Sequence, residues 1–285
     1  MKILVTGATG FLGNLVVENL LNQGLEIVAT GMSLEKAKKT QWYSKVIFKP
    51  LDESNINDSV NYFDYFGRPD KLIHLAWANL PNYKEAFHLN VNLPNQKKLL
   101  RNLIKNGLTD ITVSGTCLEY GMNEGKLDEL MSAKPTVAYA IAKLELYNFL
   151  STLTTDISLK WLRLFYIFGE GQPKHSLFNQ LQAAINNKSA EFKMSGGEQV
   201  RDFLEADKMA QYMATIALQN KVTGIVNVCS GRPKRVIDFV NEVLDVADYR
   251  LKLILNSYPY LDYEPMQFWG DTAKLQTIIN SNGSN

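Results

Sequence analysis

Tyr139 and Lys143 are the residues of this chain whose types and spacing most directly suggest acid–base chemistry. They stand four residues apart within a helical pattern over residues 136–155, and residues four apart on a helix share one face. A phenol has an ordinary pKa of about 10, and a neighbouring ammonium group lowers that pKa. The pair could therefore exchange a proton with a substrate. The same spacing also occurs on helices that have only a structural role.

A glycine-rich turn near the start of the chain predicts a nucleotide-binding site. Residues 1–6 form an apolar run typical of a strand, residues 7–13 read Gly-Ala-Thr-Gly-Phe-Leu-Gly, and a helical pattern follows. In such a turn Gly7 permits a tight bend, Gly10 lets the backbone approach a pyrophosphate, and Gly13 lets the helix lie close to the sheet. The helix N-terminus then offers N–H groups and a partial positive charge to the phosphates. The residues of this turn expected to contact a nicotinamide cofactor are Gly7, Thr9, Gly10, Phe11 and Leu12.

The composition is that of an ordinary globular protein and disfavours several classes of partner. The chain has 285 residues, 46% of them hydrophobic, and 30 Lys and Arg against 29 Asp and Glu leave a net charge of +1. This balance indicates neither a nucleic-acid nor an anionic-membrane partner, and no apolar run approaches the roughly 20 residues of a membrane span. Cys117 and Cys229 make no disulfide framework, which is typical of a reducing compartment. His74, His88 and His175 lie far apart in the sequence, so we expect a cytoplasmic protein with no metal site.

Strand-like and helix-like segments alternate through the first two-thirds of the chain. The expected strands are residues 3–6, 27–30, 46–48, 72–75, 111–114, 159–164 and, later, 225–228. The expected helices are residues 12–23, 54–66, 83–106, 136–155, 176–187, 206–219 and 236–246. Such alternation predicts an α/β protein with a doubly wound parallel sheet, a Rossmann fold, which binds ligands at the carboxyl ends of its strands.

The pattern loosens after residue 168, which suggests a second, smaller unit. We expect a dinucleotide-binding domain over residues 1–165, with residues around 204–228 returning to it. Residues 166–203 and 229–285 are expected to form a smaller, interleaved C-terminal α/β lobe that binds the substrate. The aromatic stretch over residues 258–269 either closes over the substrate or anchors this lobe, and the anchor is favoured.

Several motifs follow one another in a characteristic order. Thr6–Gly13 matches T-G-x-x-G-x-x-G, Ser114–Gly121 matches S-S-[ST]-x-x-x-Y-G with glycine in the second position, and Tyr139–Lys143 matches Y-x-x-x-K. Shorter matches occur at Leu51-Asp52, His74–Trp77, Asn92, Arg163–Gly169, Gly197–Phe203 and Asn227–Pro233. With these motifs the chain resembles the extended short-chain dehydrogenase/reductases of the NAD(P)-dependent epimerase/dehydratase family, which act on nucleotide sugars.

The resemblance implies roles for individual residues. Tyr139 would protonate a sugar carbonyl oxygen as hydride arrives, and Thr116 would donate a hydrogen bond to the same oxygen. Lys143 would hold the nicotinamide ribose and lower the pKa of Tyr139. Arg201 would pair with the substrate diphosphate, and Trp77 would shape the sugar site. The remaining cofactor contacts would be Asp52, Leu75, Ala76, Trp77, Asn92, Ser114 and Tyr166, the last replacing the family's usual asparagine.

The family contains reductases, epimerases and dehydratases. A dehydratase usually has Asp-Glu directly after the catalytic threonine, whereas Cys117-Leu118 follow Thr116 here. The chain resembles the short reductases of surface-polysaccharide and O-antigen pathways, so we expect reduction of a nucleotide-activated 4-keto-6-deoxyhexose, linked for example to dTDP or CDP. A nucleotide-sugar 4-epimerase is the alternative within the family. A non-catalytic NAD(P) sensor is the alternative from another class, but such relatives lack the tyrosine–lysine pair.

The residues after the second expected strand bear on the choice of cofactor. An acid in that place would bind the ribose 2′-hydroxyl of NAD, and residues 29–34 contain none. Ser33 and one of Lys36, Lys38 or Lys39 could accept a 2′-phosphate, although the lysines are equally consistent with a solvated helix face. We therefore expect NADP(H) to be preferred and NAD(H) to be possible. A homodimer formed through the two long helices is expected only by analogy with the family.

Overall fold

A parallel sheet of seven strands forms the centre of the computed structural model, which describes residues 1–153 and 157–282. The strands are β1 (Lys2–Thr6), β2 (Glu26–Ala29), β3 (Ile47–Phe48), β4 (Lys71–His74), β5 (Asp110–Thr116), β7 (Ser158–Leu164) and β11 (Gly224–Val228). Their order across the sheet is β11-β7-β5-β4-β1-β2-β3. The predicted Rossmann fold is confirmed, and each of these strands lies within two residues of its predicted bounds. The order reverses between β1 and β4, where such sheets bind ligands.

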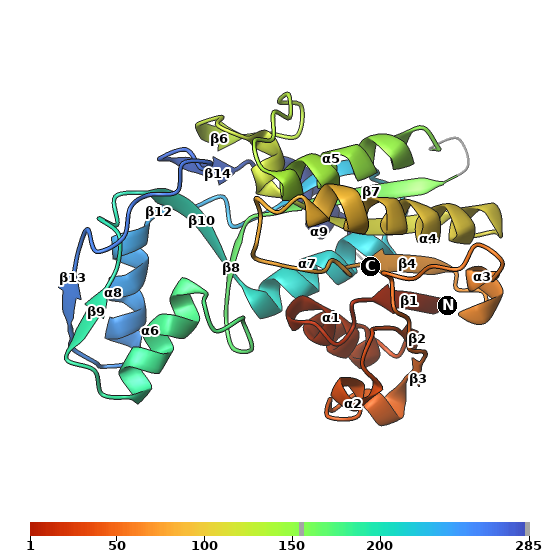
Figure 1. The fold of residues 1–285 in the computed structure, drawn as a ribbon, viewed down its shortest axis with the longest axis horizontal. Coiled ribbons are helices and arrows are strands. Elements are labelled where there is room, and N and C mark those ends of the chain that lie inside the picture. Colours follow the sequence, from red (N-terminus) through yellow and green to blue (C-terminus); the bar gives the residue numbers. More distant parts are fainter. Residues whose placement is uncertain (154–156, 283–285) are drawn as a thin grey trace.

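Helices cover both faces of this sheet (Figure 1). On one face lie α1 (Phe11–Asn22), α7 (Ala206–Leu218) and α9 (Ala273–Asn282), whose apolar residues join one buried cluster with β1, β2 and β11. On the other face lie α3 (Tyr62–Tyr65), α4 (Leu93–Lys105) and α5 (Ala138–Ser151), which share a second cluster with β4, β5 and β7. Strands buried on both faces explain the near-continuous apolar runs in the sequence.

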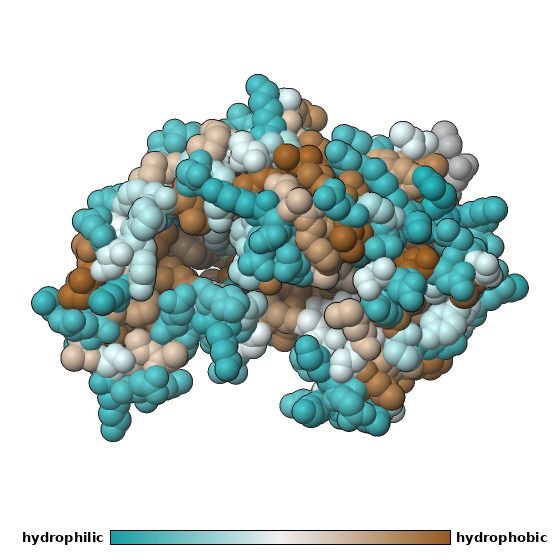
Figure 2. All heavy atoms as spheres, in the orientation of Figure 1, coloured by the Kyte–Doolittle hydropathy of each residue, from teal (hydrophilic) through white to brown (hydrophobic). Residues whose placement is uncertain are grey.

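A second group of elements lies beyond the carboxyl ends of β7 and β11. Strands β8 (Tyr166–Phe168), β10 (Val200–Glu205) and β12 (Pro233–Arg235) form a three-stranded sheet, and β9 (Glu191–Lys193) pairs with β13 (Lys252–Ile254). Helices α6 (Leu177–Asn186) and α8 (Val236–Val246) pack with them around their own apolar cluster. Figure 2 shows a notch in the outline between this part and the side built by α1 and α2 (Leu34–Ala37). The domain boundaries drawn from the sequence remain a prediction.

One strand pair brings the end of the chain back to the central sheet. β14 (Phe268–Gly270) pairs with β6 (Gly125–Leu127), which follows β5 after a short 3-10 turn at Cys117–Tyr120. The aromatic stretch that ends in β14 therefore lies near the carboxyl end of β5. Within the described ranges, no helix has the length and apolar character needed to cross a membrane.

Three predicted helices differ from the observed ones. The helix expected over residues 54–66 is reduced to α3, because the side chains of Asp52 and Asn57 accept backbone hydrogen bonds from Ser54 and Ser59 and form turns instead. The helix expected over residues 83–106 begins at a π-helical turn, His88–Asn92, and continues as α4. The helix expected over residues 136–155 is α5, and its predicted end at Thr155 lies outside the described residues. The sequence did not predict α2, α9, a 3-10 turn at Tyr43–Lys45 or the short strands β6, β8, β9, β10, β12, β13 and β14.

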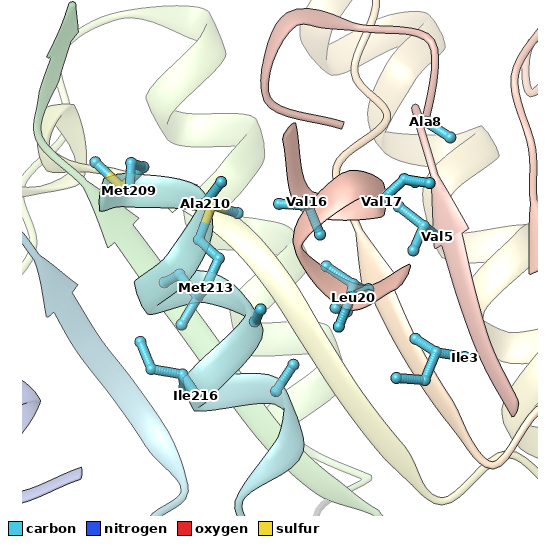
Figure 3. Close-up of a cluster of buried hydrophobic side chains, with 14 of the residues drawn as sticks. Ile3, Val5, Ala8, Val16, Val17, Leu20, Met209, Ala210, Met213 and Ile216 are labelled. Carbon is cyan, nitrogen blue, oxygen red and sulfur yellow. The ribbon is translucent and has the colours of Figure 1, made fainter. Parts of the chain in front are cut away.

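The packing of α1 against α7 holds the nucleotide-binding turn on the sheet. Figure 3 shows Val16 and Leu20 of α1 facing Ala210 and Met213 of α7. All four side chains are buried in the same cluster. This shared burial holds α1 against α7 and so helps to fix the start of α1 beside the end of β1.

Leu20→Ala should destabilise the protein by about 2–5 kcal/mol, because it leaves a cavity in a fully buried cluster. Urea unfolding followed by circular dichroism measures this loss. Leu34→Ala, which truncates an exposed leucine on α2, is the matched control and should cost less than about 1 kcal/mol. Equal losses in the two variants would contradict the assigned role of the α1–α7 contact.

Candidate active site

The turn between β1 and α1 is a cradle that only glycine can form. Gly7 has φ +66°, and a Cβ there would lie 2.8 Å from the backbone nitrogen of Ala76. A Cβ at Gly13 would lie 2.1 Å from the carbonyl oxygen of Gly7. Thr6, just before the turn, shares a hydrogen bond with His74 Nδ1 (2.8 Å) and accepts one from the Ala76 N–H (3.3 Å). The ends of β1 and β4 are thereby fixed to each other beside the cradle.

This cradle fits the pyrophosphate of a dinucleotide. Gly10 is the N-cap of α1 and, as a glycine, brings no side-chain acceptor to the N–H groups of the first turn. Those N–H groups and the helix dipole favour an anion. The backbone of Gly31, after β2, approaches so closely that a Cβ there would lie 2.8 Å from the Thr9 hydroxyl. Phe11 lies against the Gly171 backbone, which closes the cradle on the other side.

Two predicted cofactor residues at the far end of the crevice already have partners within the protein. The Ser33 hydroxyl caps α2 by accepting a hydrogen bond from the Lys36 N–H (3.2 Å). The Asp52 carboxylate accepts hydrogen bonds from the backbone (2.9 Å) and the hydroxyl (2.6 Å) of Ser54, and these bonds lower the pKa of Asp52. Both residues lie after strand ends on the ligand-binding edge of the sheet. Leu12, Leu75 and Ala76 occupy the same edge, at the start of α1 and after β4.

Lys143 of α5 is buried and only 1% exposed. Its Nζ donates a hydrogen bond to the carbonyl oxygen of Ser114 (2.7 Å) and stands 4.1 Å from the ring centroid of Trp77. Burial lowers the pKa of Lys143 to about 7. Its Nζ is therefore held between the end of β5 and Trp77, which lies beyond the end of β4, and the expected contact with a nicotinamide ribose stays a prediction.

Tyr139 is the second buried group of the site. Its ring stands 5.9 Å from that of Trp77, and the Lys143 Nζ lies 6.0 Å from the Tyr139 ring centroid. Burial raises the pKa of Tyr139 well above its ordinary value, whereas a hydrogen bond with the Thr116 side chain lowers it. Thr116, Tyr139 and Lys143 are thus brought together. Burial is the largest of the effects on the pKa of Tyr139, and the expected lowering of that pKa by Lys143 stays a prediction.

A buried ion pair fixes Thr116. The Glu119 carboxylate accepts hydrogen bonds from the Thr116 N–H (2.9 Å), the Arg163 Nε (2.9 Å) and the Trp161 Nε1 (3.0 Å). The Thr116 hydroxyl accepts the Leu118 N–H in return (3.2 Å), which completes a capping box. This geometry also explains the unusual glycine at position 115: a Cβ there would lie 2.3 Å from the Trp161 Nε1 and 2.6 Å from Glu119 Oε1.

Two site residues were missed by the sequence analysis. His88 Nδ1 accepts hydrogen bonds from Trp77 Nε1 (3.1 Å) and Asn92 Nδ2 (3.2 Å), so Nε2 carries the proton and donates to the Asn82 carbonyl (3.0 Å). The predicted residue Asn92 therefore acts within the site through His88. The four-residue spacing of His88 and Asn92 could have indicated this.

Tyr83 is the other missed residue, and it covers the candidate acid. Its ring centroid lies 5.3 Å from that of Tyr139, and its carbonyl oxygen accepts the Tyr139 N–H (2.9 Å). Burial raises the pKa of Tyr83 to about 12. It belongs to a loop between β4 and α4, and no pattern in the sequence links it to α5.

Arg201 of β10 and Tyr166 of β8 lie together on two paired strands. Arg201 is 2% exposed, and its Nε donates to the Tyr166 hydroxyl (3.1 Å). Its other nitrogens donate to the Glu264 carboxylate (3.0 Å) and to the carbonyl oxygens of Val200 (2.9 Å) and Met266 (3.2 Å). The predicted diphosphate contact of Arg201 therefore requires that at least Glu264 be displaced. Tyr166, a predicted cofactor contact, is held here by Arg201.

A glycine cradle at the switch point of a parallel sheet, with a buried tyrosine, lysine and threonine beside it, defines a dinucleotide-binding protein of the Rossmann class. A model of the NAD dependent epimerase/dehydratase family matches residues 3–229, and the chain belongs to this family. Within residues 1–153 and 157–282, no group of three His, Cys, Asp or Glu side chains could hold a metal ion.

The relatives include two sugar 4-dehydrogenases from Aggregatibacter actinomycetemcomitans. The chain is 28% identical to a dTDP-6-deoxy-L-talose 4-dehydrogenase (NAD(+)) over 277 residues, which cover 95% of this chain and 99% of that protein. It is 22% identical to a GDP-6-deoxy-D-talose 4-dehydrogenase over 285 residues, 99% of this chain and 92% of that protein. The preference for NADP(H) finds no support in these relatives.

Solved structures share the fold. UDP-glucuronic acid 4-epimerase from Bacillus cereus, in complex with UDP-glucuronic acid and NAD, superposes with a TM-score of 0.84 at 21% identity, covering 98% of this chain and 93% of that one. MoeE5 in complex with UDP-glucuronic acid and NAD superposes with a TM-score of 0.81 at 21% identity, with the same coverage of 98% and 93%.

Gly115→Ser, which restores the residue usual in the family motif, should lower turnover by about tenfold or more, because its side chain would push Glu119 and Trp161 away and misplace Thr116. Adding Trp161→Phe removes the closest clashing atom and should recover part of the loss. Steady-state kinetics measure both effects, and circular dichroism checks the fold. Full activity in Gly115→Ser would show that contact with Trp161 is not the reason for glycine at position 115.

Proposed function

We propose that this protein transfers hydride between a nicotinamide cofactor and C4 of a nucleotide-linked 6-deoxyhexose, and that it acts as a 4-ketoreductase. The observation that carries the proposal is the meeting of Thr116, Tyr139 and Lys143 beside the glycine cradle. Two relatives named as 4-dehydrogenases of 6-deoxytalose nucleotides support the choice of sugar and carbon. A dehydrogenase and a ketoreductase catalyse the same step in opposite directions.

Tyr139 is the proposed acid for the reduction. A phenol has an ordinary pKa of about 10 and is therefore protonated near neutral pH. A protonated phenol can donate to the carbonyl oxygen while the carbonyl carbon is reduced. A reduced nicotinamide would supply the hydride to the carbonyl carbon and be oxidised in the process, and Tyr139 would supply the proton that completes the hydroxyl group. Thr116 donates a second hydrogen bond to that oxygen, and Lys143 holds the ribose of the nicotinamide.

The 4-epimerase remains the second candidate, since a structural neighbour of 0.84 TM-score carries that name. Incubation with NADH or NADPH and a panel of dTDP-, GDP-, UDP- and CDP-linked 6-deoxyhexoses, in both 4-keto and 4-hydroxy forms, separates the possibilities. A ketoreductase consumes one cofactor molecule for each sugar reduced. An epimerase interconverts 4-hydroxy sugars without net consumption. Tight cofactor binding with no turnover of any sugar would favour the sensor and would overturn the proposal.

Several finer features belong to the same proposal. We propose that the enzyme serves surface-polysaccharide synthesis, such as that of O-antigen, in the cytoplasm, and that it works as a homodimer. The nucleotide is proposed to be dTDP or GDP, the two that occur in the names of the related 4-dehydrogenases.

Tyr139→Phe should lower kcat by about 100-fold or more, because it removes the donated proton and leaves the ring in place. Cofactor affinity, measured by fluorescence quenching, should change little. Tyr147→Phe on the same helix is the matched control, since its ring packs against Trp161 away from Tyr139. Retained turnover in Tyr139→Phe would remove Tyr139 from the acid role.

NADH should support a kcat/KM about tenfold higher than NADPH, contrary to the expectation from the sequence. Two groups expected to hold a 2′-phosphate have internal partners, since Ser33 caps α2 and Lys38 pairs with Glu35 (3.0 Å). Glu35→Gln releases Lys38 and should improve the use of NADPH selectively. A preference of the parent enzyme for NADPH would contradict this assignment.

A further inference from the structure

The aromatic stretch before β14 crosses the substrate side of the crevice as a strap, defined here as residues 258–265. Backbone hydrogen bonds anchor the two ends: Ser257 N–H donates to the Met194 carbonyl (2.9 Å), and the carbonyl of Met266 accepts the Val200 N–H (2.9 Å). Three consecutive side chains in its middle, Asp262, Tyr263 and Glu264, each contact a different part of the site.

Glu264 makes the buried contact of the strap. Its side chain is 8% exposed, and its carboxylate pairs with the 2% exposed Arg201 at 3.0 Å. The Arg201 guanidinium also lies 4.7 Å from the ring centroid of Phe268 and 5.4 Å from that of Tyr166. A cation so enclosed requires an anion, because removing one partner of a buried ion pair leaves an uncompensated charge.

Asp262 and Tyr263 extend the same arrangement to the loop before α4. Asp262 pairs with Lys84 at 2.8 Å, with side chains 76% and 62% exposed. The ring of Tyr263 stands 6.3 Å from that of Tyr83, which in turn covers Tyr139. A pocket beside the N-terminus of α5 is lined by Lys84, Asp262, Tyr263 and residues 136–138. The strap thus places two carboxylates on two cations at the edge of the candidate sugar site.

We propose that the strap is an internal competitor for the substrate, in which Glu264, assisted by Asp262, occupies the cation that the diphosphate of the nucleotide sugar takes. This inference rests on the proposed function, because it requires a nucleoside diphosphate as ligand. The diphosphate takes the place of the Glu264 carboxylate. Both are oxygen anions, so Arg201 keeps charge-assisted hydrogen bonds after the exchange. Glu264 then moves to water, where a carboxylate is well solvated.

Because Arg201 is buried, opening of the strap is coupled to binding of the diphosphate. If the strap opened with no anion bound, the buried Arg201 guanidinium would be left without a counter-charge. If a diphosphate were bound, it would supply that counter-charge. Departure of Glu264 also carries away Tyr263 and Asp262, which removes the contact on Tyr83 and uncovers Lys84. Tyr83, which covers Tyr139, thus loses its contact with the strap when the diphosphate has taken Arg201.

Glu264→Gln tests the exchange, because it removes the competing charge and keeps the shape of the side chain. Isothermal titration of the NAD-loaded protein with dTDP, GDP, UDP and CDP should give a Kd about tenfold lower in Glu264→Gln for the nucleotide that the parent protein binds. The gain should disappear in the double variant Glu264→Gln/Arg201→Gln. Asp262→Asn, at an exposed position, should give a smaller gain and serves if Glu264→Gln folds poorly. The matched control is Glu242→Gln on α8, which removes a carboxylate from a surface ion pair with Lys234 of β12.

The outcomes separate this inference from the proposed function. If the parent protein binds a nucleoside diphosphate and neither Glu264→Gln nor Asp262→Asn tightens binding beyond Glu242→Gln, the strap is not a competitor, and the proposed function stands. A gain that persists without Arg201 also overturns the inference. If the parent protein binds NAD and none of the four nucleotides, both fail.

Discussion

The buried carboxylate of Glu119 is the interaction on which the candidate site depends. It joins Arg163 on β7 to the backbone N–H of Thr116 at the end of β5, and Trp161 donates to it from the same strand as Arg163. Removing one partner of such a pair typically costs about 3–5 kcal/mol. The position of the Thr116 hydroxyl relative to Tyr139 is therefore set by the pairing of β5 with β7, and the rigidity of the sheet is transmitted to the reacting groups.

Much of the fold could be predicted because its signals are local. The apolar runs of the central strands and the periodicity of α1, α7 and α8 are carried by neighbouring residues, so their bounds agree closely with the structure. The short strands outside the central sheet were not predicted, since three-residue segments such as β9 and β13 gain their pairing from each other across a long stretch of chain. Helix α3 was overestimated because Asp52 and Asn57 offer the backbone side-chain acceptors that compete with a helix.

The residues of the candidate site also fall into those that the sequence could predict and those that it could not. Tyr139 and Lys143 are linked by helix spacing, and the glycine turn by its place between a strand and a helix, so these residues could be identified without coordinates. Tyr83 and Glu264 could not, because their partners Tyr139 and Arg201 are distant in the chain. The burial that raises the pKa of Tyr139 could not be inferred from the sequence either, because the degree of burial depends on the whole fold.

The pairing of β14 with β6 has a consequence for the order in which the molecule is completed. A ribosome delivers the glycine turn and the Tyr139–Lys143 pair long before it delivers β14 and the residues just ahead of it. A nascent chain can thus assemble the start of the nucleotide cradle before β6 has its partner strand. At that stage Arg201 is already synthesised, but the Glu264 carboxylate that pairs with it is not.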